Sequence, residues 1–194
     1  MNEKIEVSTG GSASYYTTYI ADPCNKDQLP FYAECVDIME ELRFNYSESN
    51  VFKAIWRRAA ARTSNIVKKN TSALYDAEKI LFFSLRLASY NRRTVGSPID
   101  LTLRMLLKKY EYFHGTIYIA RPESLLQAPY QVNINDIIKA LEFTDEEATI
   151  VRILWLSSSA RDERTKLGAY FSVSISTSLR ELAHKLYETE VEKT

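Results

Sequence analysis

The chain has 194 residues, and its 25 basic and 25 acidic side chains give a formal net charge of zero. A balanced charge excludes a whole-protein attraction to nucleic acid, so charge-based binding must come from a local patch. Two cysteines and two histidines are too few for a disulfide framework or a histidine-rich metal site.

The composition favours a helix-rich globular fold, because Gly and Pro occur only 5 times each. We expect a mainly α (α+β) protein, with a helical N-terminal unit and a C-terminal part of helices and two or three short strands. Residues 1–14 are expected to form a flexible tail, 15–93 the helical unit, and 96–194 a C-terminal unit packed on it. No internal repeat is apparent.

The N-terminal unit is expected to begin with a strand and continue with three helices. An aromatic and β-branched run is typical of a strand, and the later apolar residues recur at helical spacing. Ser49 or Asn50 is expected to cap the second helix. The predicted order is strand 15–20, loop 22–30, helix 31–42, helix from 50 to about 62, connection 63–72 and helix 73–90.

The C-terminal unit is expected to mix helices with strands. Thr144 and Glu147 form a capping box, and Ser178 and Glu181 form another that opens the last helix. Pro98 suits the first turn of a helix. The predicted order is helix 99–113, strand 116–120, loop 127–131, helix 134–141, helix from 145, strand 170–175 and helix 179 to about 191.

Several chemically distinctive side chains are expected to be structural. Trp56, Trp155 and Cys35 fall at apolar helix positions and are expected in the core. His114 lies at an expected helix end and His184 at the surface, so neither requires a catalytic role. The N-terminus lacks a signal-peptide core, and no apolar run approaches membrane-spanning length, so we expect a cytoplasmic protein without membrane contact.

The segment from Asn50 to Lys69 carries six basic residues and no Asp or Glu. Basic residues four apart share a helix face, so two cationic stripes are expected beside an Asn near the helix start, which suits a phosphate. A competing interpretation is a solvated face that pairs with the preceding acidic helix. The cations are Lys53, Arg57, Arg58, Arg62, Lys68 and Lys69.

Three short motifs occur at residues 34–40 (ECVDIME), 50–57 (NVFKAIWR) and 76–83 (DAEKILFF). Together they resemble the SaV-like family, a small domain common in phage genomes. That family includes a phage deoxynucleoside monophosphate kinase without the usual Gly-rich phosphate loop. The resemblance spans roughly residues 31–90 and implies a phage origin, a helical core, and nucleotide binding or phosphoryl transfer.

The motifs and the charge pattern together define an expected site. Phosphoryl transfer without a Gly-rich loop requires cations and Mg²⁺ around the transferred group. Ser49, Ala54 and Ala59 depart from the Gly, Tyr and Gly of the family, and its upstream His has no visible counterpart, so no catalytic residue is assigned. The expected phosphate ligands are Asn50, Lys53, Arg57, Arg62 and Lys79. The expected Mg²⁺ ligands are Asp37, Glu41 and Asp76.

The leading hypothesis is a phage accessory protein that binds nucleotide phosphate, with a deoxynucleoside monophosphate kinase-like activity as its enzymatic form. The alternative is a non-enzymatic interaction protein that binds or inhibits a host protein, or self-assembles. The 13 tyrosines and the unmatched C-terminal half favour this alternative. A homo-oligomer agrees with the resemblance. Nucleic acid is disfavoured as a ligand, because acidic residues 145–147 open the helix that would approach it.

Overall fold

The fold is mainly helical with a few short strands, which confirms the expected fold class. A computed structural model describes residues 4–6, 13–64, 66–68, 71–95, 115–120, 128–161 and 166–194. The helix predicted over 99–113, with His114 after it, lies outside these residues. Within them, no helix combines the length and apolar character needed to cross a bilayer.

The elements form three two-stranded pairs and a set of packed helices. β2 pairs with β3 and β5 with β6, both antiparallel, while β1 and β4 are parallel. The strands are β1 (Lys4–Glu6), β2 (Thr17–Ile20), β3 (Phe31–Glu34), β4 (Ile66–Lys68), β5 (Thr116–Ile119) and β6 (Tyr130–Asn133). The helices are the 3₁₀ turn η1 (Ser14–Tyr16), α1 (Cys35–Glu41), α2 (Tyr46–Ser64), α3 (Ala73–Val95), α5 (Ile134–Ala140), α6 (Asp145–Arg161) and α7 (Lys166–Val191).

The chain contains two copies of one supersecondary unit, which corrects the expectation of no internal repeat. Each copy is a β-hairpin, a seven-residue helix and two long helices in the same order. The first copy runs from β2 to α3, and the second from β5 to α7. Thr17 pairs with Glu34 in the first hairpin and Thr116 with Asn133 in the second, a shift of 99 residues at both positions.

The same shift relates the starts of the second helices. The backbone amide of Asn45 donates to Glu48 Oε2 at 2.8 Å, and that of Thr144 donates to Glu147 Oε2 at 3.1 Å. In return, Asn45 Oδ1 and Thr144 Oγ1 each accept from the amide three residues on. Each pair is a capping box, so two orphan amides are satisfied reciprocally at both helix starts.

The last helices of the two copies, α3 and α7, have the same pattern of buried and exposed positions when they are aligned with this shift of 99 residues. Several positions shifted by 99 residues are buried in both α3 and α7, and the exposed positions 82, 85 and 86 match the exposed positions 181, 184 and 185. The matched buried pairs are Ile80 with Leu179, Ser84 with Ala183, and Leu87 with Leu186. The repeat therefore extends through the last helix of each copy.

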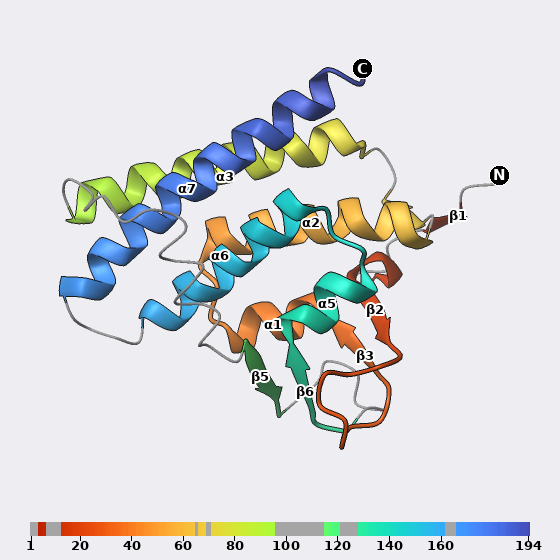
Figure 1. The fold of residues 1–194 in the computed structure, drawn as a ribbon. Helices are drawn as coiled ribbons and strands as arrows, with labels where there is room; N and C mark the ends of the chain where they lie inside the picture. Colours follow the sequence, from red (N-terminus) through yellow and green to blue (C-terminus); the bar gives the residue numbers. More distant parts are fainter. Residues whose placement is uncertain are drawn as a thin grey trace.

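The two copies are arranged as in a twofold dimer, on a single chain. Helix α1 contacts β5 and α5 contacts β2, so each hairpin packs on the short helix of the other copy. The matched residues Phe31 and Tyr130 meet, with ring centroids 4.6 Å apart, which places them near the pseudo-twofold axis. Figure 1 shows the hairpins at one side and α3 beside α7 at the other.

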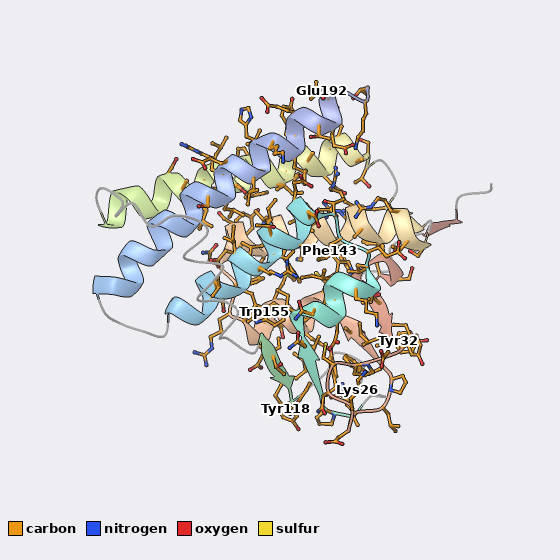
Figure 2. All side chains as sticks on the ribbon, viewed as in Figure 1. Lys26, Tyr32, Tyr118, Phe143, Trp155 and Glu192 are labelled. Carbon is orange, nitrogen blue, oxygen red and sulfur yellow. The ribbon has the colours of Figure 1, made fainter. Side chains whose placement is uncertain are left out.

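One hydrophobic core joins the copies. Trp56 and Trp155 are 0% and 3% exposed, and Cys35 is also buried, so all three expected core positions are confirmed. In Figure 2, Trp155 lies between Tyr118 on the hairpin side and Glu192 at the far side. The division into units 15–93 and 96–194 stays a prediction, although buried residues from both belong to one cluster.

Several predicted elements are wrong in type or extent, because tertiary partners override local preference. Residues 31–34 form β3 rather than helix, since β2 pairs with them. Residues 170–175 are helical within α7, which packs along α3, so Ser178 lies inside a helix rather than at its start. Residues 130–131 begin β6 instead of ending a loop, 66–68 form β4, and β1 lies within the expected tail.

Candidate functional site

Arg57 of α2 is held by two groups that come from other elements. Its guanidinium makes a close ion pair with the Asp76 carboxylate of α3, and Nη1 donates to the Tyr16 hydroxyl at 2.9 Å. Burial raises the pKa of Asp76 and the pKa of Tyr16. Burial alone would lower the pKa of Arg57, but Asp76 and Tyr16 outweigh it, so the pKa of Arg57 rises and the arginine stays charged.

Arg58 and Arg62 of α2 converge on carboxylates of the second copy. Glu147, at the start of α6, is fully buried; its Oε1 lies 3.0 Å from Arg58 Nε and its Oε2 2.5 Å from Arg62 Nη2. Arg58 Nη2 also lies 3.0 Å from Oε1 of Glu190 on α7. Lys193 binds the same Glu190 oxygen at 2.7 Å. This network links α2 to both long helices of the second copy.

A cavity of about 420 Å³ opens beside this network, between α2, α3 and the end of α7. Five basic side chains and only two carboxylates line it. Ser72 caps the start of α3 at its rim, with Oγ accepting from the Tyr75 amide at 3.0 Å. The lining residues are Tyr15, Arg57, Arg58, Ala61, Arg62, Lys68, Thr71, Ser72, Ala73, Asp76, Glu190 and Lys193.

Glu190 supplies one of the two negative charges in the lining of the cavity. Burial raises the pKa of its carboxyl, but hydrogen bonds from Lys193 and Arg58 outweigh burial and lower it. Glu190 is therefore ionised at neutral pH and offsets part of the positive charge. The five lining cations still outnumber Asp76, Glu190 and Glu147, the last of which pairs with Arg58 and Arg62 from outside the lining.

The structure brings together two of the five expected phosphate ligands, Arg57 and Arg62. The side-chain Nδ2 of Asn50 instead donates to the Tyr46 carbonyl at 2.7 Å, so Asn50 lies inside α2 rather than at its start. Lys79 lies over the rings of Tyr75 and Phe83, with Nζ 5.4 and 5.7 Å from their centroids.

The remaining expected ligand, Lys53, is half-buried and does not line the cavity. Sequence reasoning did not select three cations that do line it, Arg58, Lys68 and Lys193. Arg58 and Lys68 lie in the acid-free segment, so the charge pattern contained them. Lys193 carries no sequence signal, because it reaches the cavity through the packing of α7 against α3.

The expected Mg²⁺ ligands have separate surroundings. Asp37 accepts from the Tyr130 hydroxyl at 3.1 Å, Asp76 pairs with Arg57, and Glu41 is exposed. Among the described residues, no three His, Cys, Asp or Glu side chains form a group that could hold a metal ion. The Mg²⁺ assignment stays a prediction, and the separate positions of these three side chains do not support it.

Comparisons with family models, with characterised proteins and with solved structures give no match. The resemblance of residues 34–40, 50–57 and 76–83 to the SaV-like family therefore stays a prediction. The chain itself supplies a comparison, because its second copy repeats the fold of the first.

The second copy keeps the fold with few of the charges that line the cavity in the first. Most of the charged lining residues of the first copy match a neutral residue 99 positions further along the chain. The pairs are Arg57 with Leu156, Arg58 with Ser157, Lys68 with Leu167, Asp76 with Ile175 and, as the exception, Arg62 with Arg161. Residues 166–171 are already helical at the start of α7, whereas the matching part of the first copy includes the end of β4, and α3 begins only at Ala73. The charged lining contributed by α2, β4 and α3 is thus a property of one copy.

Proposed function

We propose that the chain binds the phosphate group of a nucleotide in the cavity between α2, α3 and α7. The supporting observation is the excess of lining cations, which number five against the two lining carboxylates and the buried Glu147 that pairs with Arg58 and Arg62. A volume of about 420 Å³ lies within the range of about 300–1,000 Å³ that small-molecule sites usually have. The second copy has the neutral Leu167 at the position that matches Lys68, and no ion pair with a described residue accounts for Lys68, which supports a role beyond folding.

The role of each lining residue in phosphate binding depends on the ion pairs and hydrogen bonds that it already makes. Arg57 is held by Asp76 and Tyr16, so its role is structural. Lys68 and Lys193 are exposed, so these two can turn toward a phosphate at little cost. The first turn of α3, at Ser72 and Ala73, adds amide groups and the positive end of the helix dipole.

Nucleotide titration followed by thermal unfolding tests this proposal. A deoxynucleoside monophosphate or triphosphate at about 100 times its dissociation constant should add about 2.7 kcal/mol to the free energy of unfolding. Lys68→Ala and Lys193→Ala should each weaken binding by about tenfold, because each removes a charge-assisted bond. Lys139→Ala, at an exposed position of α5 outside the cavity, serves as the matched control.

Two outcomes would contradict the proposal that the cavity binds a nucleotide phosphate. One is the absence of any shift with every nucleotide, with or without Mg²⁺. The other is binding that Lys68→Ala and Lys193→Ala leave unchanged. Phosphate transfer from ATP is assayed on the same samples, since binding without transfer would retain the site and discard the kinase-like activity inferred from the SaV-like resemblance.

A further inference from the structure

The outer face of α3, with the start of α2 beside it, carries a largely exposed apolar surface, in which Lys79 lies over the ring of Tyr75. We call it the α3 patch, and it comprises Tyr46, Tyr75, Phe82 and Leu85. These side chains are 72%, 39%, 57% and 43% exposed, and they are four of the nine exposed large apolar or aromatic side chains among the described residues. Phe83 links two of them underneath, with its ring centroid 5.0 Å from Phe82 and 5.6 Å from Tyr46.

The second copy shows that the fold does not need this patch. At the positions shifted by 99 residues the chain has Asp145, Ser174, Glu181 and His184. Asp145, Glu181 and His184 are exposed, as are their partners in the first copy. Equivalent helices in equivalent settings thus carry polar residues in one copy and aromatic or aliphatic residues in the other. Exposed apolar clusters of this kind mark interaction surfaces.

The charges beside Phe82 indicate what covers the patch. Glu78 and Arg86 lie four residues before and four residues after Phe82, on the same stripe of α3, and both are exposed. An antiparallel second copy of α3, related by a twofold axis at Phe82, would set Glu78 against Arg86 of that copy. The reverse pair forms by the same symmetry, because a twofold interface contacts itself reciprocally.

We propose that the chain associates with a second copy of itself through the α3 patch, in an antiparallel arrangement centred on Phe82. The two Phe82 side chains bury each other, and the Glu78–Arg86 pairs on either side set the register. Figure 1 places α3 in the outermost helical layer, beside α7 and away from the hairpins. The α3 patch and the charged cavity use different residues, so this proposal does not depend on nucleotide binding.

Sedimentation velocity over a range of protein concentrations tests the interface. The chain should sediment as a dimer, and Phe82→Glu should raise the dimer dissociation constant at least about tenfold, equivalent to about 1.4 kcal/mol. The matched position already carries Glu181 in a folded helix, so this variant should fold, which circular dichroism checks. Tyr118→Glu, at an exposed aromatic on β5, should leave the dimer intact.

A charge exchange tests the register. Glu78→Arg should weaken the dimer by placing two arginines together, and Glu78→Arg combined with Arg86→Glu should restore it. A wild-type chain that stays monomeric at every concentration overturns the proposal. So does a dimer that Phe82→Glu leaves unchanged, or one that the double exchange fails to restore.

Discussion

A single buried carboxylate, that of Glu147, has two structural roles at the boundary between the copies. It completes the capping box of α6 with Thr144, and it holds Arg58 and Arg62 of the first copy. A fully buried charge is tolerated only when it is paired and hydrogen-bonded, and both conditions are met here. Its matched residue, Glu48, makes the same cap with Asn45.

Glu147→Gln should therefore destabilise the protein strongly. The amide keeps the size of the side chain but removes the buried carboxylate that Arg58 and Arg62 share, so that Arg58 keeps only Glu190 as a countercharge. A broken buried pair of this kind costs about 3–5 kcal/mol. Glu146→Gln removes a largely exposed pair with Lys185 and should cost at most about 1 kcal/mol. Urea unfolding monitored by circular dichroism measures both. Equal, small losses would mean that the buried network does not hold the copies together.

At the scale of elements, the sequence is informative wherever the signal is local. The Thr144–Glu147 box, the strand at 116–119 and most of α3 are confirmed, because caps and periodicity act within a few residues. The choice between strand and helix at 31–34 and 170–175 depends on distant partners that no local pattern contains.

The same distinction holds for the candidate site. Arg57 and Arg62 could be selected from an acid-free run on one helix, and both line the cavity. Lys193 could not, because only the packing of α7 against α3 brings it there. Nor could the true partners of the arginines be read from sequence spacing, since Arg58 and Glu147 lie 89 residues apart.

Matched cap substitutions test where α2 begins. Asn45→Ala and Thr144→Ala should each lower the free energy of unfolding by about 1 kcal/mol, because each leaves helix-start amides without an acceptor. Asn50→Ala should cost less than either, since Asn50 lies inside α2 and Ala is the better helix former. If urea unfolding finds Asn50→Ala as costly as Asn45→Ala, the helix starts near residue 50 instead.

At the scale of the whole molecule, the repeat is conserved in hydropathy and backbone more than in residue identity. Cys35 matches Ile134 and Met39 matches Ile138, while Arg57 matches Leu156. Even the second residue after the short helix keeps its backbone conformation, with φ of 50° at Arg43 and 48° at Glu142. Substitutions of this kind preserve the packing and erase the sequence signal, which is why structure was needed to find the second copy.

The repeat also supplies a natural pair of reporters, because the chain has two tryptophans and they occupy matched positions. Trp56 and Trp155 are buried in α2 and α6 respectively, one in each copy. The single-tryptophan variants Trp56→Phe and Trp155→Phe then report on one copy at a time. Trp56 Nε1 has no hydrogen-bond partner among the described residues, so Phe there removes no hydrogen bond.

Both variants should unfold in urea with a single transition, and in each the fluorescence midpoint should coincide with the midpoint from circular dichroism. One core and the Arg58–Glu147 pair span the copies, so neither copy can lose its structure without exposing the apolar face of the other. Separate midpoints for the two probes within one variant would instead show that 15–93 and 96–194 unfold independently. In that case the buried contacts between α3 and α7 would resemble a docked interface rather than a shared core.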